Sequence, residues 1–323
     1  MVASHFFSSL LGTVPPHVVV IINPISGKVG RMDVARERAE RAATLIARRG
    51  LDAQVFMTAR PGHARELAAA ALDRGVTFVL AWGGDGTVNE VASVLAFREA
   101  ALAIIPSGSG NGLARELRIP LDPDRAFDVA FGGRECRIDA GELDHRLFFN
   151  IAGIGLDARV AHRFAADGLV RRRGFVRYLQ IAAQELFTYK PDYHTVVTDG
   201  SSVRVHALLI AIANGRQYGN GAVIAPAARL DDGRLDVVVV ARRSPFAAIM
   251  QAPRLFMGQI DRVYGVTSVS AIDIEVTSAH PMVYHVDGEP FVGGASIAAR
   301  PHPAALRVMV PADARLDVMG SAG

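Results

Sequence analysis

The sequence GGDGT at residues 83–87 is the most informative stretch of the chain, because it joins a short apolar run to a segment with the period of a helix. Similar runs and helical segments alternate on either side of it. They predict strands at residues 18–22, 55–57, 78–82 and 102–105, and helices at 32–49, 63–74 and 88–97. This alternation predicts an α/β domain with a parallel sheet flanked by helices, in which ligands bind beyond the carboxyl ends of the strands.

The second half of the chain has a different pattern. Beyond residues 132–133 the segments are short, rich in β-branched residues and interrupted by Gly, Asp, Asn and Pro. They predict the strands of an antiparallel sandwich or barrel at residues 204–213, 235–241, 272–277 and 282–286. One helix is expected at 173–187, where Val176, Leu179, Ala183 and Leu186 form an apolar stripe. A stripe that faces the core is favoured over one that faces a membrane. We therefore predict an N-terminal α/β domain at 1–137, completed by about 298–323, and a β-rich domain at 138–297.

Length and composition fit two folded domains of ordinary size. The chain has 323 residues, and its formal net charge of +3 is too small to predict nucleic-acid binding. Cys136 is the single cysteine, so the chain cannot form an internal disulfide and a reducing cytoplasm is expected. No signal peptide is recognisable, and no apolar run approaches the roughly 18 residues of a spanning helix, so membrane contact is expected to be peripheral. The basic run at residues 171–173 is either a contact for anionic headgroups or a solvated helix end.

Two further glycine-rich turns follow predicted strands, NPISGK at residues 23–28 and SGSGNG at 107–112. All three turns are expected on one edge of the sheet. Glycine allows backbone amides to approach phosphate oxygens, and a following helix adds free N–H groups and a positive dipole. A carboxylate such as Asp85 is repelled by a triphosphate unless it contacts Mg²⁺ or a substrate hydroxyl. We therefore expect Mg²⁺-ATP, with Thr87 capping the next helix and Lys28 either contacting phosphate or exposed to solvent.

Any one of these turns is also a common connection between a strand and a helix. Only the set of three, on one edge, predicts a phosphate site. The P-loop pattern that ends in Gly-Lys-Ser/Thr is absent, and GxGxxG does not follow the first predicted strand. A P-loop NTPase and a dinucleotide-binding domain are therefore disfavoured.

The turns and their continuations resemble the diacylglycerol kinase catalytic-domain family, which includes bacterial lipid kinases, sphingosine kinases and ceramide kinases. The matching stretches are NPxSG at 23–27, GGDGTVNEV at 83–91, PxGSGNGLA at 106–114, NIAGIGLDA at 150–158, NGRQYGNG at 214–221, residues 225–236 and VDGEP at 286–290. NAD kinases and phosphofructokinases carry similar GGDGT stretches, but the continuation VNEV and the C-terminal matches separate them. The resemblance covers residues 17–312. It implies an N-terminal domain like that of NAD and diacylglycerol kinases, a lipid-binding sandwich, and ATP in the cleft between them.

The resemblance also implies roles for individual residues. Contacts with ATP are expected from Asn23, Ser26, Gly27, Thr58, Gly83, Gly84, Asp85, Gly86, Thr87, Asn89, Glu90, Gly108 and Ser109. Asp287 is the expected general base, because a lipid hydroxyl that attacks the γ-phosphate must lose a proton. Glu289 lies beside it, and Asp85 is expected as a further catalytic group. From the local sequence alone, Asp287-Gly288 is also a common hairpin turn.

Two other positions follow from the resemblance. Asp157 lies where sphingosine kinases bind the polar headgroup of the substrate, and the alternative is the end cap of a helix or strand. Some relatives hold a structural Mg²⁺ near an Asp-Asp-Gly stretch, which Asp232 and the carbonyl of Arg234 match. Arg229 occupies a position that is acidic in some relatives, which disfavours a cation there.

The sequence thus predicts an ATP-dependent kinase for a lipid hydroxyl, as in diacylglycerol or a sphingoid base. It would use ATP and Mg²⁺ in the cytoplasm, in peripheral contact with the membrane that holds its lipid substrate. The alternatives are a kinase of a soluble substrate such as NAD, and a nucleotide- or lipid-binding protein without turnover. The acceptor lipid, the occupancy of the structural metal site and a homodimer stay open.

Overall fold

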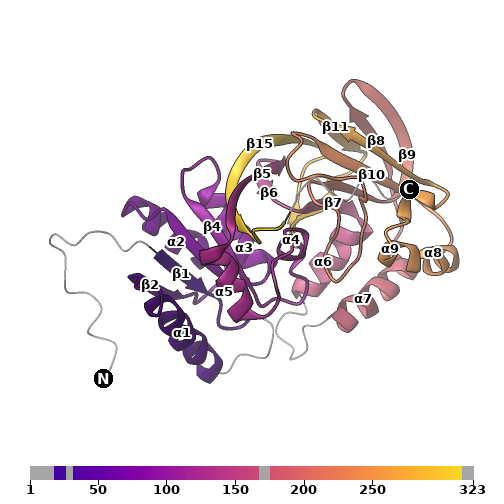
Figure 1. The fold of residues 1–323 in the computed structure, drawn as a ribbon. Coiled ribbons are helices and arrows are strands. Elements are labelled where there is room, and N and C mark those ends of the chain that lie inside the picture. Colours follow the sequence, from indigo (N-terminus) through magenta and orange to yellow (C-terminus); the bar gives the residue numbers. More distant parts are fainter. Residues whose placement is uncertain (1–17, 27–31, 167–174, 315–323) are drawn as a thin grey trace.

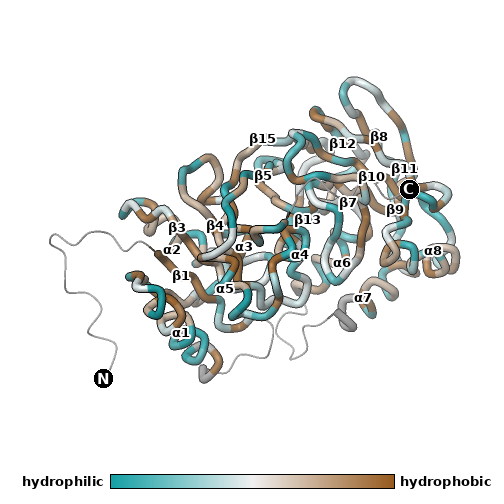
Figure 2. Tube along the Cα trace, viewed as in Figure 1, coloured by the Kyte–Doolittle hydropathy of each residue, from teal (hydrophilic) through white to brown (hydrophobic). Residues whose placement is uncertain are grey.

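The structure is a computed structural model that describes residues 18–26, 32–166 and 175–314. Its N-terminal part is a parallel sheet in the order β2-β1-β3-β4, formed by Ala53–Met57, Val18–Ile22, Phe78–Gly83 and Ala101–Pro106. Every residue of β1 and β4 is buried, because helices cover both faces of the sheet. Helices α1 (Met32–Ala47) and α5 (Pro123–Gly132) lie on one face, and α2 (His63–Asp73) lies beside α3 (Asp85–Leu95) on the other (Figure 1). Figure 2 shows the hydrophobic β1 beside α1, whose hydrophilic and hydrophobic residues alternate.

The C-terminal part is a sandwich of antiparallel strands. One layer contains β7 (Ile151–Gly155), β9 (Ser201–Ala213), β10 (Leu235–Ala241), β11 (Val266–Ala271), β13 (Val283–Val286) and β14 (Glu289–Val292). The other contains β5 (Arg134–Leu143), β6 (Arg146–Phe148), β8 (Tyr193–Thr198), β12 (Ile274–Ser278) and the first half of β15 (Ser296–Val310). Side chains such as Ile210 and Tyr284 from the first layer pack against Val276 and Ile297 from the second, and they form the core.

Two long strands hold the two parts together. Strand β15 pairs with β12 in the sandwich, and its residues Arg307 and Val308 pair in parallel with Ala101 and Leu102 of β4. Strand β5 runs antiparallel to β15 across this whole length. The α/β domain with its parallel sheet and the β-rich sandwich are therefore confirmed. The expected boundary at 137 lies inside β5, so the exact limits of the two domains stay predictions.

Five short helices complete the described chain. They are α4 (Gly112–Glu116), α6 (Leu156–Ala166), α7 (Phe175–Thr188), α8 (Pro245–Gln251) and α9 (Pro253–Phe256), followed by a 3₁₀ turn at Ile260–Arg262. Helices α6 and α7 pack together beside the sandwich (Figure 1). Within the described ranges, none of the helices has the length and apolar character that crossing a membrane requires.

The strand predictions agree better with the structure than the helix predictions. The four N-terminal strands match within two residues. Helix α3 begins at Asp85 rather than at 88 because Gly84 is its N-cap, and it ends at Leu95, before Phe97 adopts a positive φ of 63°. Helix α6 was not predicted.

The expected core-facing stripe of α7 is wrong. Leu179 and Ala183 are exposed, and the side chain of Val176 lies outside the described residues. The buried positions are Ile181 and Glu185, with Leu186 partly buried. A pattern of apolar residues could not reveal this face, because one of its central members is a glutamate.

Candidate active site

The three glycine-rich turns meet at the carboxyl edge of the parallel sheet, as predicted. The Ser26 hydroxyl lies 2.6 Å from the hydroxyl of Ser107, which joins the first turn to the third. Asn23 Nδ2 donates to the hydroxyl of Thr87 at 2.9 Å, which joins the first turn to α3. Gly27 and Lys28, both part of the first turn, lie outside the described residues.

The second and third turns approach each other so closely that both need glycine. A Cβ on Gly108 would lie 2.5 Å from the Cα of Gly84, which is shorter than any ordinary van der Waals contact. Both atoms belong to the backbone, so neither can move away as a flexible side chain could. The backbones of the two turns therefore meet at the edge where the strands end, without side chains between them. The amides of Gly108, Asn111 and Gly112 already donate to side chains within these turns.

Thr87 is not the N-cap that the sequence predicted. Gly84 occupies that position, and Thr87 is a buried residue in the first turn of α3. A Cβ on Gly83 would lie 2.4 Å from the Cβ of Thr87, so the threonine packs directly onto the glycine. Its hydroxyl accepts the hydrogen bond from Asn23. Thr87 thus holds the first two turns together.

Asp85 caps the next helix. Its Oδ2 accepts from the amide of Asn111 at 2.8 Å, and its Oδ1 accepts from the amide of Gly112 at 2.6 Å, at the start of α4. Burial, together with the negative charge of Asp287, raises the pKa of Asp85 to about 6, while the hydrogen bonds from the amides oppose the shift. The carboxylate thus has a structural partner without Mg²⁺, although each oxygen keeps a lone pair for a further contact.

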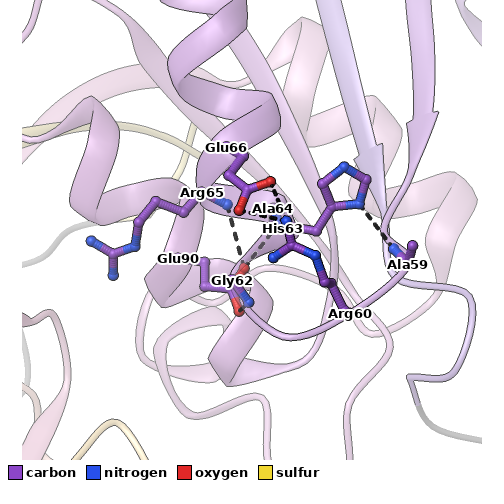
Figure 3. Close-up of polar contacts among 8 residues, drawn as sticks. All are labelled: Ala59, Arg60, Gly62, His63, Ala64, Arg65, Glu66 and Glu90. Carbon is purple, nitrogen blue, oxygen red and sulfur yellow. Dashed lines mark hydrogen bonds and ion pairs between the residues drawn. The ribbon is translucent and has the colours of Figure 1, made fainter.

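Glu90 faces the N-terminus of α2 (Figure 3). Its carboxylate accepts from the amides of Gly62 at 2.8 Å, Ala64 at 3.0 Å and Arg65 at 3.3 Å. An acidic group at this end of a helix is favoured by the free N–H groups and by the dipole. Glu90 therefore orders the loop after β2, which begins with Thr58. Direct contact of Glu90 or Thr58 with a nucleotide stays a prediction.

Asp287 reaches the turns from the other domain. Its Oδ2 accepts from Asn89 Nδ2 of α3 and from the amide of Phe149, both at 2.9 Å. Its Oδ1 accepts from the amides of Asn150 at 3.0 Å and Ile151 at 3.1 Å. Burial raises the pKa of the carboxylate, and the four donors oppose that shift. Two residues 198 positions apart are therefore joined where the two domains meet, one helical turn from the glycine stretch.

Glu289 approaches the same stretch from the sandwich. A Cβ on Gly86 would lie 2.6 Å from Glu289 Oε1, so only glycine leaves the carboxylate its present position. The two acidic side chains after β13, Asp287 and Glu289, thus lie over the turn that contains Asp85. This brings the three predicted catalytic residues together at the junction of the two domains.

Asp157 lies in the first turn of α6 and is buried within the sandwich domain. Its Oδ2 accepts from the hydroxyl of Tyr218 at 2.8 Å and lies 3.3 Å from His285 Nε2. The other ring nitrogen of His285 accepts from the amide of Gly288, so Nε2 carries the proton and donates to Asp157. A hydrogen-bonded path therefore links Asp157 to the turn that contains Asp287. Its contact with a substrate headgroup stays a prediction.

The described residues contain no cluster of three or more His, Cys, Asp or Glu that would hold a metal on its own. At the predicted structural metal site, Asp232 accepts from the amide of Arg234, whose guanidinium pairs with Asp199. Arg229 pairs with Asp231 nearby, which brings a positive charge to the place where some relatives hold a structural cation. Mg²⁺ that is bound by phosphates needs only one or two protein carboxylates, and the lone pairs of Asp85 fit that requirement.

Two residues to which the sequence assigned no role, Arg38 and Asn150, help to build this site. Arg38 of α1 donates to the carbonyls of Asn23 and Ser26, and it thereby holds the first turn. Asn150 donates to the carbonyl of Gln217, in a loop of the sandwich that packs on the third turn. No periodicity or motif signals Arg38, because its partners are backbone carbonyls that only the folded chain brings near it.

The loop at residues 214–221 forms the rest of this joint. Asn220 Nδ2 donates to the carbonyl of Ser109 at 2.9 Å, and a Cβ on Gly219 would lie 2.9 Å from the carbonyl oxygen of Gly110. Ser109 itself is exposed. The third glycine turn is therefore held between the two domains.

Comparison with known sequences agrees with this geometry. The family model described as "Diacylglycerol kinase catalytic domain" matches residues 17–143. The family model described as "YegS C-terminal NAD kinase beta sandwich-like domain" matches residues 150–310. A protein of Klebsiella pneumoniae named "Probable lipid kinase YegS-like" is 33% identical over 278 residues, which cover 85% of this chain and 92% of that protein. A "Diacylglycerol kinase" of Mycobacterium tuberculosis is 31% identical over 301 residues, which cover 91% of this chain and 95% of that protein.

Solved structures show the same fold. A diacylglycerol kinase from Bacillus anthracis superposes with a TM-score of 0.67 at 19% identity, over 93% of this chain and 98% of that one. An NAD kinase from Archaeoglobus fulgidus in complex with ATP reaches a TM-score of 0.51 at 14% identity, over 93% of this chain and 95% of that one. At such low identities these likenesses concern the architecture alone.

Proposed function

The chain belongs to the diacylglycerol kinase catalytic-domain family, and we propose that it is an ATP-dependent lipid kinase that phosphorylates a lipid hydroxyl. The coarser conclusion, a phosphotransferase of the lipid kinase type, follows from the family itself. The observation that carries the finer proposal is the hydrogen bond between Asp287 and Asn89, because it places an acid of the sandwich beside the glycine turns.

In this proposal Asp287 accepts the proton of the lipid hydroxyl. The hydroxyl oxygen forms a bond to the γ-phosphorus, the bond from that phosphorus to the bridging oxygen of ADP breaks, and the proton passes to the carboxylate. The buried surroundings that raise the pKa of Asp287 make it a better acceptor. Each of its two oxygens already accepts two hydrogen bonds, so the lipid hydroxyl must displace one of the four donors. The Asn89 amide is the side-chain donor among the four, and we propose that it turns away.

The ATP phosphates would lie against the amides of the three glycine turns, at the close approach of Gly84 and Gly108. Asn23 and Thr87 hold the first two turns in place, and Glu90 orders the loop that carries Thr58. Mg²⁺ bound with the phosphates would neutralise their charge, and Asp85 is the protein carboxylate placed to hold it. Such a contact would also stabilise the ionised form of Asp85, which burial disfavours.

For the acceptor we propose diacylglycerol before a sphingoid base. The support is the name of the Mycobacterium tuberculosis relative, "Diacylglycerol kinase", with 31% identity over 91% of this chain. Asp157 would bind the polar end of the lipid, after Tyr218 or His285 releases its oxygen. We further propose that the lipid is taken from a membrane surface.

An acceptor screen tests this proposal. Purified protein with ATP and Mg²⁺ would be offered dioleoylglycerol in mixed micelles, sphingosine in the same micelles, or NAD in buffer, and ADP and the product mass would be measured. We expect ADP and a singly phosphorylated lipid with dioleoylglycerol. ADP formation with NAD alone would make the protein an NAD kinase, and ATP binding without turnover on any acceptor would make it a binding protein.

A further inference from the structure

Seven of the exposed large apolar side chains of the sandwich domain belong to α7, to α8 and α9, and to the segment that follows them. Figure 1 shows α8 and α9 beside α7 at one end of the molecule. We call this region the α8–α9 surface. It consists of Phe187, Phe246, Ile249, Met250, Phe256, Met257 and Tyr264. The rings of Phe187 and Phe246 meet edge to face at 5.8 Å between centroids, so the surface is continuous from α7 to α8. Apolar groups that gather on a surface in this way mark a site of interaction.

Helix α8 turns its apolar side outward. Phe246, Ile249 and Met250 have the spacing i, i+3 and i+4 of one helix face, and 74% of Phe246 and 76% of Met250 are exposed. No residue of α8 or α9 is buried, and the residues of α8 that are partly covered include the small Ala247 and Ala248. A helix stripe with this spacing normally faces a protein core. Here it faces away from the protein, which indicates that another apolar phase covers it.

Positive charge accompanies these apolar side chains. Residues 242–264 contain four arginines and one aspartate, a net charge of +3, which equals the formal net charge of the whole chain. The guanidinium of Arg243 lies 5.0 Å from the ring centroid of Tyr264, and its Nη1 donates to the carbonyl of the same residue. Tyr264 is 83% exposed. Arginine and tyrosine around exposed phenylalanine and methionine are typical of a surface that enters the headgroup region of a bilayer.

We propose that the α8–α9 surface docks the protein on an anionic lipid bilayer, and this inference rests on the proposed lipid kinase function. The apolar side chains enter the boundary between headgroups and acyl chains, and Arg242, Arg243, Arg254 and Arg262 bind lipid phosphates. A two-fold dimer through the same surface would set these four arginines against their own copies. The charge therefore favours a membrane over a second copy of the chain.

The position of the surface fits a lipid substrate. Ala248 of α8 packs on the apolar cluster formed by Leu156 and Val160 of α6 and Ile181 of α7. Leu156 directly precedes Asp157, the residue that we propose for the lipid headgroup. Docking through α8 therefore brings the bilayer to the helix that packs against the base of α6, the helix that carries Asp157.

Vesicle sedimentation tests the docking directly. Wild type is compared with Phe246→Gln/Met250→Gln on vesicles of phosphatidylglycerol and phosphatidylcholine in equal parts, without ATP or acceptor. We expect binding to fall at least about tenfold, because two apolar side chains no longer enter the bilayer. The control is Phe97→Gln, which replaces an exposed phenylalanine of the other domain whose ring contacts His302 edge to face. Equal binding by the double variant and wild type would overturn the proposal.

Charge is tested separately. Arg243→Gln/Arg254→Gln should lose most of its preference for these vesicles over pure phosphatidylcholine, whereas Arg36→Gln, an exposed arginine of α1 paired with Glu40, should keep it. An unchanged preference in the double variant would refute the part assigned to the arginines.

Light scattering tests the alternative that the surface binds a second copy of the chain. If wild type is a dimer and Phe246→Gln/Met250→Gln is a monomer, the surface joins two copies and the docking proposal fails.

A kinase assay separates this inference from the proposed function. With dihexanoylglycerol dissolved in buffer, Phe246→Gln/Met250→Gln should match wild type, because no membrane is involved. With dioleoylglycerol in the anionic vesicles its rate should fall at least about fivefold. Absence of ADP from both substrates in wild type would refute the lipid kinase proposal, while sedimentation would still decide the docking. Equal rates of the two proteins on vesicles would count against the docking alone.

Discussion

Asp85 and Asp287 lie at the same crevice, but their surroundings differ. Asp287 accepts four hydrogen bonds, three of them from consecutive amides at residues 149–151, so its carboxylate is fixed by the sandwich domain. Asp85 accepts hydrogen bonds from the amides of Asn111 and Gly112 and from its own amide, and burial raises its pKa to about 6. The comparison teaches that burial raises the pKa of both acids, but that donors from two domains fix Asp287, whereas the donors to Asp85 belong to the glycine turns.

The largest expected effect comes from Asp287→Asn. We expect kcat on dioleoylglycerol to fall at least about 10²-fold, the usual scale of a general base, with the affinity for ATP retained. One amide of residues 149–151 or the Asn89 amide would lose its acceptor, so the melting temperature should be measured alongside. Asp128→Asn, an exposed acid of α5 paired with Arg49, is the control and should keep full activity. Turnover near that of wild type would remove Asp287 from the mechanism and end the contrast with Asp85.

Gly108→Ala tests the turn beneath Asp85. The added Cβ would lie 2.5 Å from the Cα of Gly84, and both turns would have to separate. We expect a loss of about 1–3 kcal/mol in the free energy of unfolding and a weaker affinity for ATP of about tenfold or more. Gly132→Ala is the matched control, because its Cβ would meet nothing within 4 Å. Unchanged ATP binding by Gly108→Ala would show that phosphate does not lie at this approach.

Asp85→Asn should separate stability from activity. The native state keeps the proton of Asp85 until the pH passes about 6, whereas the unfolded chain loses it near 3.8, so this contribution to stability is lost as the pH rises through 6. A neutral asparagine avoids that loss, although one of the two amides loses its acceptor. We expect the variant to be about 1–2 kcal/mol more stable than wild type at pH 8 in the absence of Mg²⁺-ATP, and to have no advantage at pH 4.

Urea unfolding at the two pH values measures this difference, and the same preparations are assayed for kinase activity, which we expect to be strongly reduced. An Asp85→Asn variant that is less stable than wild type at pH 8 would show that the two amide contacts outweigh the burial of the charge. Asp85 would then resemble Asp287 more than we infer.

The smallest expected effect comes from Glu90→Gln. The amide nitrogen of glutamine cannot accept from the backbone N–H groups at the start of α2, and the negative charge near the helix dipole is lost. We expect a loss of about 1 kcal/mol in stability and a rise of a few-fold in the KM for ATP at constant kcat. The control is Glu66→Gln in α2, which removes an exposed ion pair with Arg60 and should leave the KM for ATP unchanged. A lower kcat would instead place Glu90 in the chemical step.

The parallel sheet and its glycine turns could be predicted because their signals are local. Val18–Ile22 is a run of Val and Ile that is buried on both faces, and a glycine turn follows it within a few residues. The three turns could be placed on one edge because parallel strands end on the same side of a sheet. The start of α3 was missed by three residues, since a glycine N-cap leaves no side-chain signal.

The rest of the crevice depends on contacts between distant parts of the chain. Arg38 binds carbonyls of the first turn, and Asn150 binds a carbonyl of the sandwich. No motif or spacing in the sequence signals either contact. The resemblance pointed to Asp287, but its four donors come from two domains. The buried face of α7 was misjudged because Glu185 is neutralised there by Arg159 and Arg163 of the unpredicted α6.

Strand β15 has a consequence for the making of the protein. Arg307 and Val308 complete the N-terminal sheet by pairing with β4, whose residues Ala101 and Leu102 leave the ribosome about 200 residues earlier. Until then the nascent chain exposes an unpaired strand edge, which is prone to wrong pairing. A truncated protein that ends before β15 should therefore aggregate rather than yield an isolated nucleotide-binding domain, because both halves need β15.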